Sequence, residues 1–244
     1  MSQYGLTWLP QEALALISKS LAPDFLFISS DDFISSNAKH RFEKRTIDSY
    51  VSVHAPLDLY SRIYDKPVQS ALPEAEELQK LLPQIVESIQ RAAEHGADAI
   101  VVLDNISSVD GPIVSPMQVV ETLMPMYEQI VLHIKELGLP AIFSSQGDIH
   151  EYYSGLKSAG FDGVHIAHQS EDELISMLDH AHKFELNAYG GIPSEILSDE
   201  DLATYIARLK EIASEYPELS ICDTGCLETY KQAEQAVHIL QELK

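Results

Sequence analysis

The stretch GADAIVVLDN, residues 96–105, contains the clearest strand signal in the chain. Its apolar run Ala99–Leu103 has the length of a buried strand and stops at Asp104. The segment before it, Glu74–His95, carries apolar residues at helical spacing and is followed by Gly96, a common helix terminator. A predicted helix that leads directly into a predicted strand indicates an α/β protein.

The same alternation continues along the chain. A capping box predicts a helix start at Ser115, where Pro116 and Gln118 follow, and the pair Ser170 and Glu173 predicts another. Short apolar runs predict seven strands: Phe25–Ser29, Tyr50–Val53, Ala99–Leu103, Ala141–Phe143, Gly163–Ile166, Leu186–Tyr189 and Ser220–Cys222. Strands that alternate with helices in this way form a parallel sheet.

We therefore predict a TIM-type (β/α) barrel, formed by residues 1–244 as a single domain. A closed barrel needs an eighth strand, for which Tyr4–Leu9 is the candidate; otherwise the barrel is incomplete or its first strand degenerate. A doubly wound open sheet is the alternative fold. No glycine-rich phosphate-binding turn follows any predicted strand, which disfavours that alternative.

Composition limits the classes of partner. The chain has 16 basic and 38 acidic residues, and its formal net charge of −22 repels nucleic-acid phosphates and anionic lipids. We expect neither nucleic acid nor a membrane as a partner, and we assign most of the excess acid to solvated helices. Cys222 and Cys226 are too few for a disulfide framework, and residues 1–10 lack a secretory pattern, so a cytoplasmic protein is expected.

The predicted site lies at the C-terminal ends of the strands, where parallel α/β folds place their chemistry. The residues at these positions are mostly polar or ionisable, whereas the strands themselves are apolar. They are Asp31, Asp32, His54, Asp104, Asn105, Ser144, Ser145, Gln146, His165, His168, Tyr189, Cys222, Asp223 and Cys226. A turn or helix-cap role remains the alternative for each of the aspartates and asparagines. Cys222, which lies inside the last predicted strand, is expected in the core.

Several features from residue 96 to residue 148 occur in a recognisable order. They are Gly-Ala-Asp-Ala, an apolar strand closing on Asp104, Ser115-Pro116, a second proline at Pro125, and Gly147-Asp148. This order resembles the uroporphyrinogen decarboxylase family, the superfamily that also holds the corrinoid and coenzyme M methyltransferases. Upstream, His54-Ala55-Pro56-Leu57-Asp58-Leu59 is similar to the family's Gly-Ala-Pro-Trp-Thr-Leu turn.

The resemblance implies a barrel and lyase-type chemistry on a carboxylated tetrapyrrole or a related small anionic substrate. The family's catalytic aspartate corresponds best to Asp31, and we add His54 and Asp104 as catalytic candidates. The decarboxylases' amino-terminal arginines have no counterpart, so the basic segment Lys39–Arg45 is the candidate replacement. The expected substrate-binding residues are Arg41, Arg45, Arg62, Ser144, Gln146 and Tyr189.

The family's methyltransferases bind zinc through His-x-Cys at a strand end and a later cysteine. Ser144 and Gln146 occupy the first two positions here, and hydroxyl and amide oxygens are poor zinc ligands. We therefore expect no cofactor. A zinc ion held by Cys226, His165 and His168 is the alternative.

Three functions are compatible with these residues. The first is a decarboxylase that binds a small anionic or tetrapyrrole-like ligand. The second is a methyltransferase that works with a corrinoid protein. The third is a catalytically silent barrel that acts as a binding or assembly subunit. An oligomer is compatible with all three.

Overall fold

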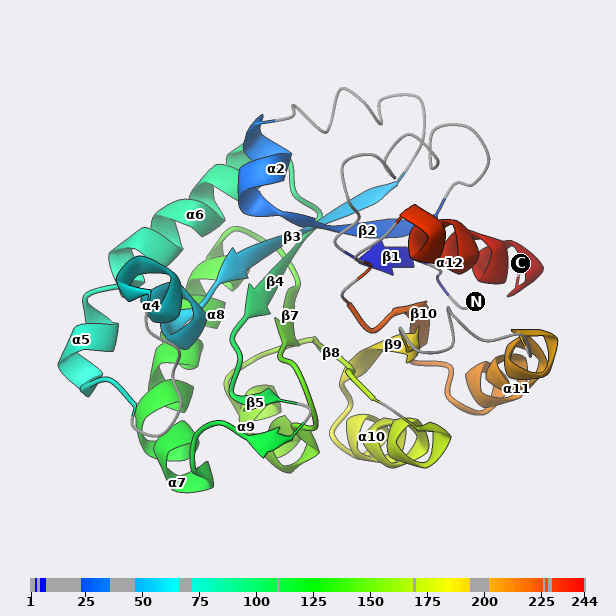
Figure 1. Cartoon of the computed structure of the whole chain (residues 1–244). Coiled ribbons are helices and arrows are strands. Elements are labelled where there is room, and N and C mark those ends of the chain that lie inside the picture. Colours follow the sequence, from blue (N-terminus) through cyan, green and yellow to red (C-terminus); the bar gives the residue numbers. More distant parts are fainter. Residues whose placement is uncertain are drawn as a thin grey trace.

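The computed structural model describes residues 3, 5–7, 23–35, 47–65, 72–108, 110–168, 170–193, 202–225, 227 and 230–243. A single sheet of eight strands forms the centre of the molecule, and helices surround it (Figure 1). Its strands are β1 (Gly5–Thr7), β2 (Phe25–Ser29), β3 (Asp48–His54), β4 (Ala99–Leu103), β7 (Ala141–Ser144), β8 (Gly163–His165), β9 (Asn187–Ile192) and β10 (Leu219–Asp223). Every neighbouring pair is parallel, and the strands follow one another in chain order.

The first and last strands of this sheet meet. The backbone N–H of Ile221 in β10 donates to the carbonyl of Gln3, just before β1, at 2.8 Å. The predicted TIM-type barrel is therefore confirmed, and Tyr4–Leu9 does contain the eighth strand. β1 is only three residues long, as expected of a degenerate first strand.

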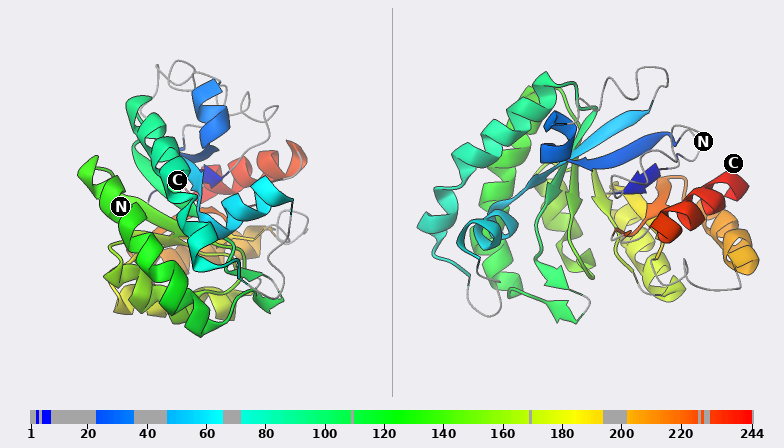
Figure 2. Two further views of the ribbon diagram at one scale, coloured as in Figure 1. Left: turned by 90° about the vertical axis from the view of Figure 1, so that its left-hand side faces the viewer. Right: turned by 45° about the horizontal axis from the view of Figure 1, so that its top comes forward.

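Helices cover the outside of the sheet (Figure 2). They are α2 (Ser30–Ser35), α4 (Pro56–Tyr64), α5 (Ala75–Gln79), α6 (Leu82–Glu94), α7 (Pro116–Gln118), α8 (Met124–Glu136), α9 (Tyr153–Ser158), α10 (Glu171–Lys183), α11 (Leu202–Glu215) and α12 (Tyr230–Leu243). Short π and 3-10 turns, η1 (Val119–Leu123) and η2 (His150–Tyr152), precede α8 and α9. A hairpin of β5 (Ser107–Ser108) and β6 (Gly111–Pro112) follows β4.

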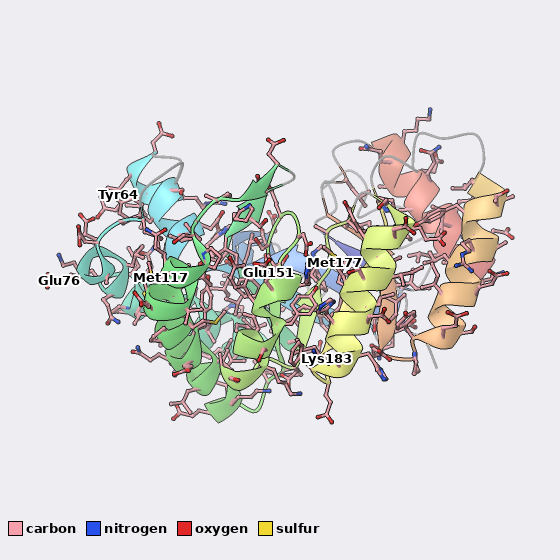
Figure 3. All side chains as sticks on the ribbon, turned by 90° about the horizontal axis from the view of Figure 1, so that it is seen from below. Tyr64, Glu76, Met117, Glu151, Met177 and Lys183 are labelled. Atoms are coloured by element: carbon pink, nitrogen blue, oxygen red, sulfur yellow. The ribbon has the colours of Figure 1, made fainter. Side chains whose placement is uncertain are left out.

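Charged side chains such as those of Glu76, Glu151 and Lys183 lie on the outside of the helices (Figure 3). Among the described helices, none combines the length and the apolar character that a membrane crossing requires.

The helix predicted over Glu74–His95 is in fact two helices, α5 and α6. Pro83 lies in the first turn of α6, where its missing N–H costs nothing, whereas inside a longer helix it would break the hydrogen-bond ladder. The capping box at Ser115 is confirmed. The Gln118 N–H donates to Ser115 Oγ at 3.3 Å, and the Ser115 N–H donates to Gln118 Oε1 at 3.1 Å.

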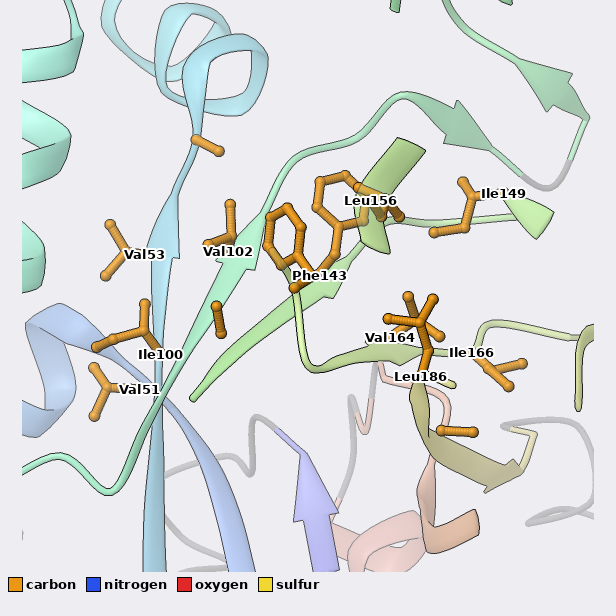
Figure 4. Packing of buried hydrophobic residues seen from close by; sticks show 14 of the residues in the cluster. Val51, Val53, Ile100, Val102, Phe143, Ile149, Leu156, Val164, Ile166 and Leu186 are labelled. Carbon is orange, nitrogen blue, oxygen red and sulfur yellow. The ribbon is translucent and has the colours of Figure 1, made fainter. Parts of the chain in front are cut away.

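The strands separate two apolar layers, because successive side chains point to opposite faces of a sheet. The larger layer packs between the sheet and the helices, and Figure 4 shows part of it, including Val51, Ile100 and Phe143. The smaller layer fills the barrel interior with Phe25, Phe27, Tyr50, Ala99, Val101, Ile142, Tyr189 and Cys222. Cys222 is therefore a core residue. Because the interior is packed, the candidate site lies above it, where the strands end.

Candidate active site

Polar side chains gather at the C-terminal end of the barrel, which we call the mouth. Five residues from five successive segments lie at this end, because the strands that carry them are parallel: Asp31, His54, Asp104, Gln146 and His168. This confirms their predicted common location. Cys226, Arg41 and Arg45 lie outside the described residues.

A chain of three hydrogen-bonding groups crosses the mouth. Ser144 ends β7 and pairs in register with His165, which ends β8. Ser144 Oγ lies 3.1 Å from His165 Nδ1, and His165 Nε2 lies 3.1 Å from the carbonyl oxygen of Asp223. Because a carbonyl only accepts, Nε2 of the neutral ring carries the hydrogen and Nδ1 accepts from the Ser144 hydroxyl. We call this chain the Ser144 relay.

Burial keeps the relay's imidazole uncharged. The side chain of His165 is almost wholly buried, and this burial lowers its pKa to about 4, although the hydrogen bond to the Asp223 carbonyl opposes the shift. The phenyl ring of Phe27 packs against it in a tilted arrangement, with ring centroids 5.3 Å apart. His165 is thus a neutral base with a fixed tautomer, and its ring contacts Phe27 of the interior layer.

His168 lies close to His165 in the loop after β8. Its pKa is also lowered to about 4, chiefly by burial and further by the neighbouring His165. Its Nδ1 is buried and has no hydrogen-bond partner among the described residues. Within that part of the chain, no three His, Cys, Asp or Glu side chains are placed to hold a metal ion. The proposed third ligand, Cys226, lies outside it.

The position of the family's zinc ligands is occupied by groups that do not fit zinc. Ser144 Oγ is engaged by His165, and the Gln146 residue is exposed, with its backbone N–H donating to Asn105 Oδ1 at 3.3 Å. The neighbouring Ser145 hydroxyl accepts from the backbone N–H of Ile106 at 3.1 Å. Oxygens already used in this way are poor ligands for zinc, so we assign it no step here.

Asp104 lies at the mouth end, but its side chain contacts α4 and α8 on the outside of the sheet. Its side chain is fully buried, Oδ1 accepts from the Asp58 N–H at 2.8 Å, and Oδ2 accepts from the Tyr127 hydroxyl at 2.7 Å. It therefore caps the N-terminus of α4, where a negative charge is favourable. Burial nevertheless raises its pKa to about 7. Asp104, expected as a catalytic candidate, is thus placed as a buried helix cap.

His54, at the end of β3, forms an ion pair that our reading of the sequence missed. Its Nδ1 lies 2.5 Å from Oδ2 of Asp58, and both side chains are partly buried. Asp58 Oδ1 in turn accepts from Asn105 Nδ2 at 3.0 Å. The i, i+4 spacing of His54 and Asp58, with Pro56 between them, was the available signal.

Three other candidates take up different positions. Tyr189 lies in the barrel interior and not after a strand, because β9 continues to Ile192. Arg62 is exposed in the last turn of α4. Asp31 is exposed in the first turn of α2, beside Asp32, whose carboxylate accepts from Ser29 Oγ at 2.6 Å.

Solved structures with this fold include several barrel enzymes. 3-Hexulose-6-phosphate synthase from Salmonella typhimurium matches with a TM-score of 0.54 and 15% identity, over 99% of this chain and 100% of the other. 3-Keto-L-gulonate-6-phosphate decarboxylase from Vibrio cholerae O1 biovar El Tor str. N16961 matches with a TM-score of 0.53 and 12% identity, over 99% and 96%. At these identities, the likeness shows the fold alone.

A methyltransferase from Methanosarcina mazei matches with a TM-score of 0.58 and 16% identity, over 86% of this chain and 63% of the other, so the chain spans less than two thirds of that protein. No curated protein sequence matches this one. The family profile described as "Uroporphyrinogen decarboxylase (URO-D)" matches residues 61–236, most of the chain. The chain therefore belongs to the uroporphyrinogen decarboxylase family.

Proposed function

We propose that the protein is a lyase that removes a carboxyl group from a small carboxylated substrate of the pyrrole or tetrapyrrole type, bound at the mouth. The observation that carries this proposal is the Ser144 relay. Family membership supports the reaction type.

Decarboxylation of a pyrrole acetate passes through a ring that has taken a proton from solvent, and the ring must later lose this proton to a base. The neutral His165 can accept that proton through Ser144, because the hydroxyl passes its own hydrogen to Nδ1 as it takes one from the ring carbon. The Asp223 carbonyl accepts the hydrogen bond from Nε2–H, and its dipole stabilises the positive charge that develops on the imidazole. The relay then returns the proton to solvent.

Asp31 is the group that we assign to the ring itself. Its carboxylate is exposed at the start of α2, at the mouth end, and it corresponds by resemblance to the family's catalytic aspartate. A carboxylate there stabilises the positive charge of the protonated ring. The spectator carboxylates of the substrate are assigned to the basic segment Lys39–Arg45, on sequence grounds alone.

The test is carbon dioxide release from uroporphyrinogen and from single-ring pyrrole carboxylates. Ser144→Ala and His165→Gln should each lower kcat about 100-fold, the low end of what proton-transfer residues contribute. The control is His95→Gln, which changes an exposed histidine at the C-terminus of α6, at the other end of the barrel.

Unchanged rates in both relay variants would refute the catalytic role of the relay. Absence of carbon dioxide from every substrate would refute the lyase proposal as a whole. If methyl transfer from methylcobalamin to a thiol were then detected, the methyltransferase function would replace it. If neither activity were detected, the third function, a catalytically silent barrel that acts as a binding or assembly subunit, would remain.

A further inference from the structure

Decarboxylation also consumes a proton, because a C–H bond replaces the bond to carbon dioxide. The Ser144 relay is built as a base, so a separate acid is needed. We propose that His54 is this acid and that Asp58 is the residue that positions it. This inference rests on the proposed lyase function.

The strand pattern directs His54 toward the inside of the barrel at its mouth. In β3 the side chains alternate, so that Tyr50 belongs to the interior layer whereas Val51 and Val53 belong to the outer layer. His54 is four residues from Tyr50 and shares its face. Its side chain is 19% exposed, so a ligand and water can both reach it.

The ion pair with Asp58 leaves one ring nitrogen available. Nδ1 faces the carboxylate at 2.5 Å, whereas Nε2 is bonded by no residue in the described part of the chain. A carboxylate that holds one imidazole nitrogen fixes the ring's orientation and balances the charge of the imidazolium. Nε2–H is therefore the proton that can be delivered to substrate.

Asp58 is itself held from two directions. Its backbone N–H donates to the buried Asp104 at 2.8 Å, and its Oδ1 accepts from Asn105 Nδ2 at 3.0 Å. Both partners directly follow β4, so the position of Asp58 is set by the barrel and not only by α4. The surface pair of His133 and Glu136, 3.6 Å apart with Glu136 exposed, has no comparable support among the bonds described.

The proposed step balances. The bond between the substrate carbon and its carboxylate breaks, carbon dioxide leaves, and the electron pair remains on carbon, delocalised into the protonated ring. His54 Nε2 then gives its proton to that carbon, and a C–H bond forms. The neutral imidazole regains a proton from water, to which it is exposed.

The experiment measures kcat and KM for carbon dioxide release by the intact protein. His54→Ala should lower kcat about 100-fold with little change in KM, and free imidazole in the assay should restore part of the rate. Asp58→Ala should lower kcat about tenfold. Asp58→Asn keeps an acceptor oxygen for Nδ1, so its kcat should fall less than that of Asp58→Ala. The matched control is His182→Ala, because His182 also pairs through Nδ1 with a carboxylate, Glu218 at 2.8 Å, but lies in the last turn of α10.

The outcomes separate the two proposals. If the unmodified protein releases no carbon dioxide, the lyase proposal fails, and this inference fails with it. If it is active, full activity of His54→Ala overturns the inference alone. A loss in His54→Ala that imidazole does not restore, in a protein that melts like the unmodified one, overturns the role as proton donor. If kcat falls equally in Asp58→Ala and Asp58→Asn, the claim that Asp58 positions His54 through Nδ1 is overturned.

Discussion

The Tyr127 hydroxyl on α8 donates a hydrogen bond of 2.7 Å to Oδ2 of Asp104, and both side chains are completely buried. This bond and the N–H groups of Leu57 and Asp58 favour the charged carboxylate. Burial opposes them and is the larger effect, so the pKa of Asp104 is raised to about 7 from 3.8. The N-terminus of α4 is thus capped by a carboxyl group, Asp104, that titrates near pH 7.

The first prediction concerns pH and stability. Between about pH 4 and pH 7 the folded protein keeps the Asp104 proton while the unfolded chain has lost it, so folding binds a proton. The free energy of unfolding should therefore fall as pH rises through this range, by about 4 kcal/mol in total. Asp104→Asn should remove this contribution, as measured by urea unfolding at several pH values. Asp172→Asn, at an exposed position, is the control. The same pH slope in Asp104→Asn as in the unmodified protein would contradict the assignment.

The second prediction isolates the tyrosine. Tyr127→Phe leaves Asp104 Oδ2 without its buried donor and should lower the free energy of unfolding by about 1–3 kcal/mol at pH 8. Tyr152→Phe is a matched control, because the Tyr152 hydroxyl is buried without a hydrogen-bond partner among the described groups. Its removal should cost close to nothing. Similar losses in both variants would show that ring packing, and not the hydrogen bond, is being measured.

The third prediction concerns the loop after β7. Gly147 has a φ of 75°, and a Cβ there would lie 2.0 Å from the Ser108 carbonyl oxygen in the hairpin. Gly138 has the same φ, but no atom lies within 4 Å of its Cβ position. Alanine at either site is destabilised by the positive φ. The difference in stability between the two variants therefore measures the clash at Gly147. Gly147→Ala should be less stable by about 2 kcal/mol or more in thermal unfolding. Equal stability of the two alanine variants would mean that the β5–β6 hairpin can move aside without a cost in free energy.

The fourth prediction concerns metal content. We expect no equimolar zinc in the purified protein, because Ser144 and Gln146 stand where the family's methyltransferases have ligands. Elemental analysis tests this directly. Zinc that is lost on Cys226→Ser would show a metal site in the family position and favour methyl transfer. Zinc that depends instead on His165 or His168 would show a relocated site.

The fifth prediction concerns anionic ligands. Carboxylated tetrapyrroles should bind at low salt, and Arg41→Ala with Arg45→Ala should weaken binding at least several-fold, because exposed charges act collectively and are screened by salt. Fluorescence titration measures this. Asp31→Asn should leave binding nearly unchanged, since its proposed role is with the reacting ring. Binding that persists in the double arginine variant would place the carboxylates elsewhere.

Strands such as β4 were predictable because they are buried on both faces and so appear as a continuous apolar run, as in Ala99–Leu103. β9 was cut short because glycines weaken a strand signal. Gly190 is required there, since a Cβ would lie 2.8 Å from the Ile166 carbonyl oxygen. Tyr189 is therefore inside β9 and not at its end, and its side chain belongs to the interior layer.

The site was harder to predict than the fold. The residues that follow each strand were correctly assigned to one end, because that follows from parallel strands alone. The direction of each side chain was not predictable, because a shift of one residue along a strand moves a side chain to the opposite face of the sheet. Asp104 therefore turned out to face the helices. Asp58 was missed because its role depends on Asn105 and Asp104, which reach it only in the folded barrel.

The bond between Gln3 and Ile221 also bears on how the molecule folds. It joins groups more than 200 residues apart, so the ring of strands cannot be completed until the last strand has been made. Helix and strand pairs that are local in the chain can form beforehand, which makes closure a late step with a high entropic cost. The amide hydrogen of Ile221 reports on this step. It should gain protection from exchange later in refolding than the amides of β4.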